Sequence, residues 1–178
     1  MRAPTGEQFE LSMSWAGGSA RAIITELAAS LRVLEIDGVA VTEPYDHDSL
    51  PPFGCGIVLA PWPNRVRDGR WQLDGETQQL DLTEPARDNA IHGLLRNTAY
   101  RVIERSAASI TLSATVFPQH GYPFLLQTSV RYEVVADGLD RLDQQGALHP
   151  TGAGERALEL GRPEVREAGR LDCGSDGR

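Results

Sequence analysis

Two segments of the chain alternate between apolar and polar residues, and this alternation limits the fold more than any other feature of the sequence. In 110-ITLSATV-116 every second residue is apolar, and 124-FLLQTSVRYEVV-135 repeats the pattern over a longer run. A period of two places successive side chains on opposite faces, as in a half-buried β-strand. No convincing amphipathic helix lies between the strand-like runs. The sequence therefore predicts an all-β protein of antiparallel strands up to about residue 139.

Asp-Gly pairs mark the expected hairpin turns, because this dipeptide suits the positive backbone angles of a tight turn. Three of the pairs follow strand-like runs: Asp37-Gly38, Asp74-Gly75 and Asp137-Gly138. The first two have strand-like arms on both sides, 31–36 with 39–43 and 70–73 with 77–82. The third pair follows the longest alternating run, so a return strand should begin there.

The composition changes after Leu139. Segment 140–178 contains no Phe, Trp, Tyr, Ile, Met, Asn or Lys, and holds seven Gly, six Arg and eight acidic residues. Such a segment cannot bury much apolar area, which predicts disorder. We expect a β-sheet part over 1–139 and an irregular tail over 140–178. Because the strand pattern stops where a return strand should begin, we hypothesise that the tail is an out-of-frame or truncated ending.

The charge and the cysteine content argue against several classes of function. The 17 basic residues, all arginine, are outnumbered by 25 acidic residues, giving a net charge of -8. This balance argues against nucleic-acid or anionic-membrane partners, which need a basic surface. Cys55 and Cys173 provide neither a disulfide framework nor metal-ligand spacing. The first 12 residues lack the apolar core of a signal peptide, so we expect a cytoplasmic protein.

Two loop-like segments contain the candidate functional residues. These segments are 61-PWPNRVRDGRWQLDG-75 and 89-NAIHGL-94. The prolines, Asn64 and the Asp-Gly pair at 68–69 interrupt regular structure in the first segment. Loops on a rigid scaffold are where binding and catalytic side chains concentrate. Arg65 and His92 are therefore the first candidates for a site.

The order of these motifs resembles the aldose 1-epimerase (galactose mutarotase) family. The resemblance runs through residues 56–102, with an Asn-Arg pair, a Gly-aromatic strand, a Leu-Asp-Gly turn, a Leu-rich return strand and an Ile-His-Gly loop. The segment 120-HGYPFLLQTSVRYEV-134 is similar to a Gly-(Tyr/Phe)-Pro stretch and its following strand. The family resemblance implies that residues 1–139 form the N-terminal part of a large β-sandwich. It also implies a role in carbohydrate metabolism, as an isomerase that interconverts the α and β anomers of an aldose without a cofactor.

The implied chemistry assigns roles to three residues. Ring opening removes a proton from the anomeric hydroxyl and delivers one to the ring oxygen, so it needs an acid and a base. By resemblance, Arg65 would bind sugar hydroxyls, and His92 would bind near the ring oxygen and assist the proton transfer. Asn64 belongs to the same substrate-binding group, with its main role in shaping the loop. No metal ion and no partner beyond the sugar are implied.

The chain departs from the family pattern in its last part. The resemblance implies a second histidine as the principal acid, then a sugar-binding aspartate and a glutamate base, all in later motifs. His149-Pro150 echoes the histidine motif without its aromatic residue or flanking strands, and we interpret it as coincidence. A non-catalytic sugar-binding module and an inactive, truncated remnant are therefore the rival interpretations. The sugar and the oligomeric state stay open.

Several other residues have simpler interpretations. A phosphate-binding cluster and a set of ion pairs with Asp68 and Asp88 explain the nearby arginines equally well. These arginines are Arg67, Arg70, Arg87 and Arg96. We expect structural or packing roles for His120, Trp62, Trp71 and Glu84, and a solvated loop at Asp46-His47-Asp48.

Overall fold

The two alternating segments form the central pair of a four-stranded antiparallel sheet. The computed structural model describes residues 2–136 and 138–148. Strands β10 (Ser109–Val116) and β11 (Leu125–Val135) pair antiparallel along the whole of β10. From Ile110 to Val116 and from Leu126 to Val134 every second residue is buried and the residues between are not, so the predicted alternation is confirmed.

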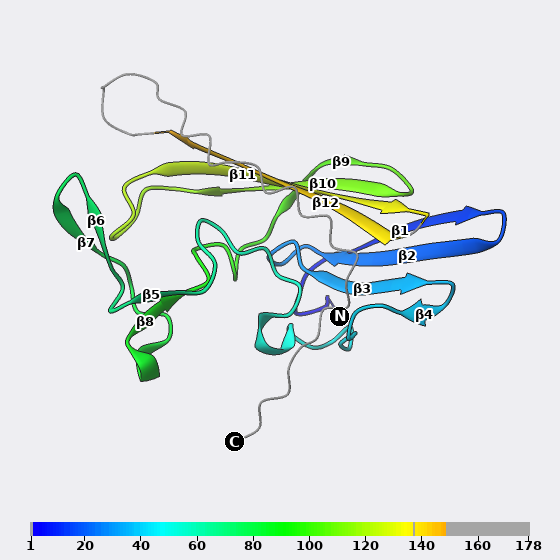
Figure 1. The fold of residues 1–178 in the computed structure, drawn as a ribbon, viewed down its shortest axis with the longest axis horizontal. Coiled ribbons are helices and arrows are strands. Elements are labelled where there is room, and N and C mark those ends of the chain that lie inside the picture. The colour runs from blue at the N-terminus through cyan, green and yellow to red at the C-terminus, as the bar shows by residue number, and fades with distance from the viewer. Residues whose placement is uncertain (1, 137, 149–178) are drawn as a thin grey trace.

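Strand β12 completes one edge of this sheet, and β9 (Arg101–Arg105) forms the other. Strand β12 covers Gly138–Leu148 and pairs with β11 over its full length (Figure 1). The third hairpin therefore has its return arm, and the prediction of irregular structure from residue 140 is wrong as far as Leu148. An edge strand takes its hydrogen bonds from one neighbour and leaves side chains such as Leu142 exposed, so it needs no regular alternation. The rest of the predicted tail, with His149-Pro150, lies outside the described residues.

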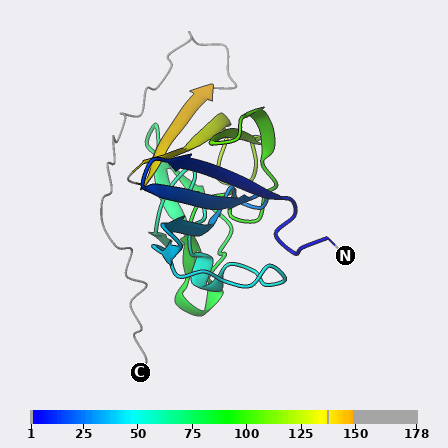
Figure 2. The same ribbon diagram turned by 90° about the vertical axis from the view of Figure 1, so that its right-hand side faces the viewer.

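A second four-stranded antiparallel sheet comes from the N-terminal part of the chain. Its order is β1-β2-β3-β4, with β1 Gln8–Trp15, β2 Gly18–Thr25, β3 Leu31–Ile36 and β4 Val39–Ala40. The β3–β4 turn has Asp37 at φ 52° and Gly38 at φ 75°, which are the positive angles that the Asp-Gly pair predicts. In Figure 2 the dark-blue β1–β2 hairpin crosses in front of the molecule, with the yellow-to-orange β11 and β12 behind it.

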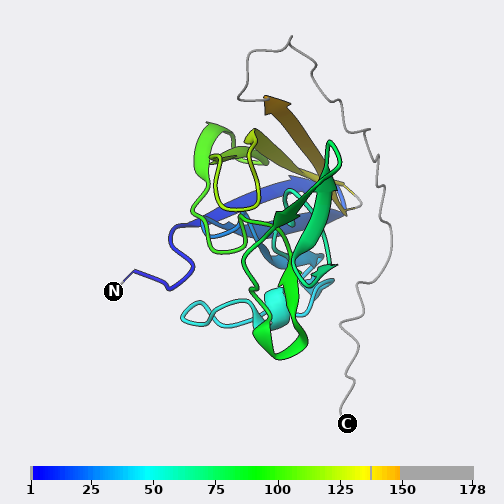
Figure 3. The ribbon, with the colours of Figure 1, turned by 90° about the vertical axis from the view of Figure 1, so that its left-hand side faces the viewer.

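Two small antiparallel ladders lie at the opposite end of the molecule from the β1–β2 turn (Figures 1 and 3). One pairs β5 (Arg65–Arg67) with β8 (Asn89–Ile91). The other is the predicted hairpin of β6 (Arg70–Leu73) and β7 (Glu76–Gln79). The helical elements of the described residues are two 3₁₀ turns, η1 Pro52–Gly54 and η2 Pro85–Arg87. None of the helices described is long and apolar enough to cross a membrane.

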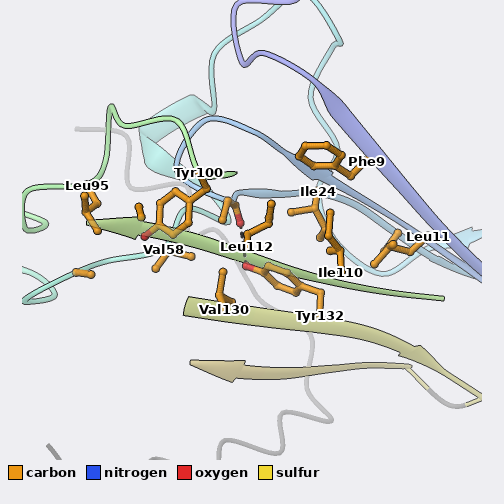
Figure 4. Close-up of a cluster of buried hydrophobic side chains, with 14 of the residues drawn as sticks. Phe9, Leu11, Ile24, Val58, Leu95, Tyr100, Ile110, Leu112, Val130 and Tyr132 are labelled. Atoms are coloured by element: carbon orange, nitrogen blue, oxygen red, sulfur yellow. Dashed lines mark hydrogen bonds between the residues drawn. The ribbon is translucent and has the colours of Figure 1, made fainter. Parts of the chain in front are cut away.

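The core lies between the two four-stranded sheets. Its largest fully buried side chains include Leu11 and Ile24 of the first sheet, and Leu112 and Tyr132 of the second (Figure 4). The Tyr132 hydroxyl donates a hydrogen bond of 2.9 Å to the carbonyl oxygen of Ala29, which ties the second sheet to the loop between β2 and β3. The fold is therefore an antiparallel β-sandwich, as the alternating strands predict.

The segment before the first candidate loop is anchored in this core. Val58 and Ala60 are buried, and the Val58 amide donates to the carbonyl of Ala28 at 2.9 Å. Leu31 donates to the carbonyl of Gly56 at 3.0 Å. Residues 56–60 therefore form a fixed support from which the chain enters the Asn64–Arg65 loop.

Candidate functional site

The β5–β8 ladder brings Asn64, Arg65 and His92 to one end of two short strands. In its register Arg65 is opposite Ile91, so Asn64 and His92 both lie just past the same end of the ladder. The His92 amide donates to the carbonyl of Asn64 at 2.8 Å. Asn64 has φ 58° and His92 has φ 61°, so both take the left-handed conformation that few residues other than glycine adopt. The two motifs far apart in sequence thus meet through their backbones.

Gly93 fixes this loop against the supporting segment. It forms a parallel bridge with Ala60, and the Leu94 amide donates to the Ala60 carbonyl at 2.8 Å. A Cβ atom at Gly93 would lie 2.0 Å from that carbonyl oxygen, a distance that real Cβ contacts do not show. The Ile-His-Gly sequence therefore uses glycine for a close backbone approach, which places His92 at a defined position.

The Arg65 guanidinium is held by a carboxylate that the sequence did not connect with it. Arg65 Nε donates to Glu84 Oε2 at 2.7 Å, and Arg65 Nη2 donates to Glu84 Oε1 at 3.0 Å. Arg65 Nη1 donates to the side-chain oxygen of Asn64 at 3.2 Å. The hydrogen bonds from Arg65 and from the Asn89 side chain lower the pKa of Glu84 to about 2. Asn64 therefore shapes the loop and also contacts Arg65.

His92 is partly exposed and has an unused ring nitrogen. Its Nδ1 atom is buried and has no hydrogen-bond partner among the described residues. Burial is the main cause that lowers the pKa of His92, and the positive charges of Arg96 and Arg65 lower it further. Glu84 opposes this shift only weakly. The imidazole is therefore neutral at pH 7, with one nitrogen that can donate a hydrogen bond and one that can accept.

Aromatic rings connect the β6–β7 hairpin to the turn before β11. Trp71 Nε1 donates to the Gly121 carbonyl at 2.9 Å, and its ring centroid lies 6.0 Å from that of Phe124. The Phe124 and Tyr122 centroids are 5.3 Å apart, and those of Tyr122 and Trp62 are 6.3 Å apart. These contacts agree with the packing roles that we expected for both tryptophans. The buried Nε1 atom of Trp62, however, has no partner in the described part of the chain.

An open hollow of about 510 Å³ lies beside the β5–β8 ladder. It is lined by Arg65, Arg67, Asp68, Arg87, Asp88 and Asn89. No ion pair within residues 2–136 joins Arg67 or Arg87 to Asp68 or Asp88, and Arg87 instead comes within 3.9 Å of Glu84. The hollow therefore contains two arginines whose charges the neighbouring aspartates do not pair, whereas Arg70 and Arg96 do not line it.

His120 and the Asp46-His47-Asp48 loop do not line this hollow. His120 Nδ1 is 2.8 Å from Asp81 Oδ1, in a pair that is mostly exposed. Asp46, His47 and Asp48 are exposed. Among the described residues, no group of three His, Cys, Asp or Glu side chains is arranged to hold a metal ion.

Comparisons of the sequence with known proteins identify a family and a relative. A sequence model of the family described as aldose 1-epimerase matches residues 30–146. The protein described as uncharacterized protein YihR, from Escherichia coli strain K12, is 36% identical over 125 residues. That match covers 70% of this chain and 41% of the relative.

Solved structures show the same fold. A galactose mutarotase-like protein from Clostridium acetobutylicum superposes with a TM-score of 0.65 at 19% identity, covering 80% of this chain and 50% of that one. A GalM/aldose epimerase homologue from C. elegans gives a TM-score of 0.63 at 15% identity, over 82% of this chain and 47% of that one. The chain therefore spans about half the length of these proteins and less than half of YihR.

Proposed function

Because this chain belongs to the aldose 1-epimerase family, we propose that its Asn64–Arg65 and His92 loops bind an aldose near the anomeric centre. The proposed reaction is interconversion of the α and β anomers by acid–base ring opening. The single observation that carries the proposal is the β5–β8 ladder, which holds Arg65 and His92 at the same end, with the His92 amide bonded to Asn64.

Arg65 retains donors for sugar hydroxyls. A guanidinium has about five N–H donors in a planar fork. Glu84 and Asn64 occupy three of them, through Nε, Nη2 and Nη1. One N–H on each of the two Nη atoms is left, and this pair suits two adjacent hydroxyls of a pyranose.

His92 is the proposed contact to the ring oxygen. A lowered pKa keeps its imidazole neutral, so the nitrogen that carries the proton can donate to that oxygen. A neutral imidazole that gave this proton away would become an imidazolate, so His92 polarises the ring oxygen through a hydrogen bond and the full transfer needs another acid. The family resemblance assigns the principal acid and the base to other, later motifs, so His92 assists the transfer.

A non-catalytic sugar-binding module is the second candidate function. The observation that favours it is that the hydrogen bonds that hold Asn64, Arg65 and His92 are all made within residues 60–94. Binding then requires only the residues held by the β5–β8 ladder, whereas turnover requires groups from the rest of the family fold.

The hollow beside Arg65 could distinguish a phosphorylated aldose from a free one. Arg67 and Arg87 line it with no charge pairing to the aspartates there, and arginine forks suit phosphate oxygens. We therefore include aldose phosphates with free aldoses as candidate ligands. The comparison of the two ligand types decides whether the hollow takes part.

The experiment measures binding and turnover on the same preparation. Isothermal titration with a panel of aldoses and their 6-phosphates reports binding, and polarimetry of freshly dissolved α-anomers reports turnover. His92→Ala is the test variant, and His47→Ala, at an exposed histidine outside the site, is the control.

Each outcome distinguishes between the candidates. Mutarotation lost in His92→Ala and kept in His47→Ala supports the epimerase. Saturable binding without turnover, weakened only by His92→Ala, supports the module. A chain that is folded by circular dichroism yet binds none of the sugars overturns both, and an unfolded chain leaves the inactive remnant.

A further inference from the structure

The structure points to Glu84 as a positioning residue, and we propose that it fixes the Arg65 guanidinium in the orientation that receives the sugar. This inference rests on the proposed function, because it assumes that Arg65 contacts the ligand. Both carboxylate oxygens of Glu84 accept hydrogen bonds from Arg65, at 2.7 and 3.0 Å. Two parallel bonds set the plane of the guanidinium as well as its position, which one bond cannot do.

Glu84 is itself held by the ladder that carries the site. Its backbone exchanges hydrogen bonds with Asn89 of β8, at 2.9 Å from the Glu84 amide and 3.3 Å from the Asn89 amide. The Asn89 side chain donates to Glu84 Oε2 at 3.1 Å. One residue earlier, the Thr83 hydroxyl accepts from the Ile91 amide at 2.9 Å. The carboxylate is therefore attached to β8, which also leads to His92.

This arrangement connects the two candidate residues through one strand. Glu84 is hydrogen-bonded to β8 and accepts hydrogen bonds from Arg65 of β5, while His92 directly follows β8. Asn64 provides the third contact to the guanidinium, on Nη1. The remaining N–H groups of Arg65 therefore keep a constant direction relative to His92.

Because the Arg65–Glu84 pair is partly exposed, it can orient the guanidinium while contributing little to the stability of the fold. The Arg65 and Glu84 side chains are 39% and 22% exposed. Ion pairs near the surface contribute little to folding, because water screens them and two long side chains lose freedom. An ordered arginine, in contrast, loses less freedom when a ligand binds. Removing the carboxylate should therefore weaken binding more than it destabilises the protein.

The test uses two substitutions of Glu84 and a matched control. Glu84→Gln removes the charge and one acceptor, while Glu84→Asp keeps the charge and shortens the reach by one methylene. Glu104→Gln is the control, since Glu104 is an exposed strand residue 3.9 Å from Arg131, far from this site in sequence. Binding is measured by titration with the aldose that the wild-type chain binds, and folding by thermal melts.

We expect Glu84→Gln to weaken sugar binding about three- to tenfold, the effect of freeing one long side chain that must then be ordered on binding. Glu84→Asp should give a smaller loss, and Glu104→Gln none, with all three proteins melting close to the wild type. Wild-type affinity in Glu84→Gln would overturn the inference. A loss equal to that of Glu104→Gln would overturn it too.

A second readout works without any sugar. In a ¹⁵N-labelled chain, the Arg65 Nε–H should give a resolved signal that exchanges slowly with water, and Glu84→Gln should broaden or remove it. If the wild-type chain binds no sugar while this signal behaves as expected, the proposed function fails and the orientation of Arg65 by Glu84 stands. If the signal is unchanged in Glu84→Gln, the positioning role is refuted whatever the sugar result.

Discussion

Replacing Gly93 with alanine should disrupt the site and destabilise the protein for a reason that can be worked out from distances. The new Cβ atom would lie 2.0 Å from the Ala60 carbonyl oxygen and 2.3 Å from the Ala60 carbonyl carbon. Contacts shorter than 3.0 Å are essentially never seen for real Cβ atoms, so the oxygen must move by about an ångström. That oxygen is the acceptor for the Leu94 amide at 2.8 Å, and the movement breaks this hydrogen bond.

Two contributions set the size of the effect. Gly93 has φ 70°, and an L-residue in the left-handed region costs about 1–2 kcal/mol. Loss of the Leu94–Ala60 hydrogen bond adds about 1 kcal/mol. The free energy of unfolding should therefore fall by about 2–3 kcal/mol, before any further cost of the displaced backbone.

A matched control isolates the steric part. Gly75 has φ 84°, so it carries the same backbone strain, yet a Cβ atom there would meet nothing within 4 Å. Gly75→Ala should cost only about 1–2 kcal/mol. Urea unfolding of both variants gives the two free energies, and titration with sugar reports whether His92, the neighbour of Gly93, has moved. Equal destabilisation by the two substitutions, with sugar binding intact in both, would refute the close-approach argument.

Three further predictions follow from the core and from the titrating groups. Tyr132→Phe removes the hydrogen bond to Ala29 from a fully buried site, and should lower the free energy of unfolding by about 1 kcal/mol in urea. Glu84 has a folded pKa of about 2, below its usual value of 4.5, so its contribution to stability is complete above pH 4.5 and is lost as the pH falls towards 2. That contribution is small for a pair near the surface, so an NMR titration of the Glu84 carboxyl is the measurement, and a midpoint at the usual value would contradict the ion pair. The pKa of His92 should lie below 6.5 in an NMR titration, and Arg96→Ala should raise it because that substitution removes a neighbouring positive charge.

The half-buried strands are the part of the fold that the sequence predicts well. In β10 and β11 one face packs into the core and the other does not, so apolar and polar residues alternate along the sequence. The turns at Asp37-Gly38 and Asp74-Gly75 are predictable for a similarly local reason, because these residues tolerate positive φ angles. Each of these signals lies within the segment that it describes.

Strand β12 gives no such signal. Its hydrogen bonds come from β11 alone, and Asp140, Arg141, Leu142 and Asp143 are all exposed. Exposed residues such as these are under no selection for alternation, so composition indicated an irregular segment. The pairing partner determines the structure here, and the partner cannot be read from residues 138–148 themselves.

In the candidate site, too, the local sequence suggests some residues, while contacts between distant segments do not follow from it. Their two loop-like segments made Arg65 and His92 candidates, and the family resemblance gave them a shared role, but their meeting depends on the pairing of β5 with β8. Glu84 was expected to be structural because the resemblance assigns the base to another motif. Its place before Pro85 in a turn does not identify Arg65, 19 positions earlier, as its partner. Side-chain contacts made across a ladder require the register, and the sequence does not supply it.

The contacts that shape the site argue that binding and turnover are separable in this chain. The bonds that set Asn64, Arg65 and His92 are made by residues 60–94, all of them within the segment that matches the family. Residues 56–60 anchor this unit in the core between the two large sheets. Under the proposed function, sugar binding therefore depends on local geometry that the chain already has. Turnover depends on an acid and a base that the resemblance assigns to other motifs. Measurable binding with no catalysed mutarotation is the result that this geometry predicts, and catalysed mutarotation would show that residues of this chain complete the proton transfer.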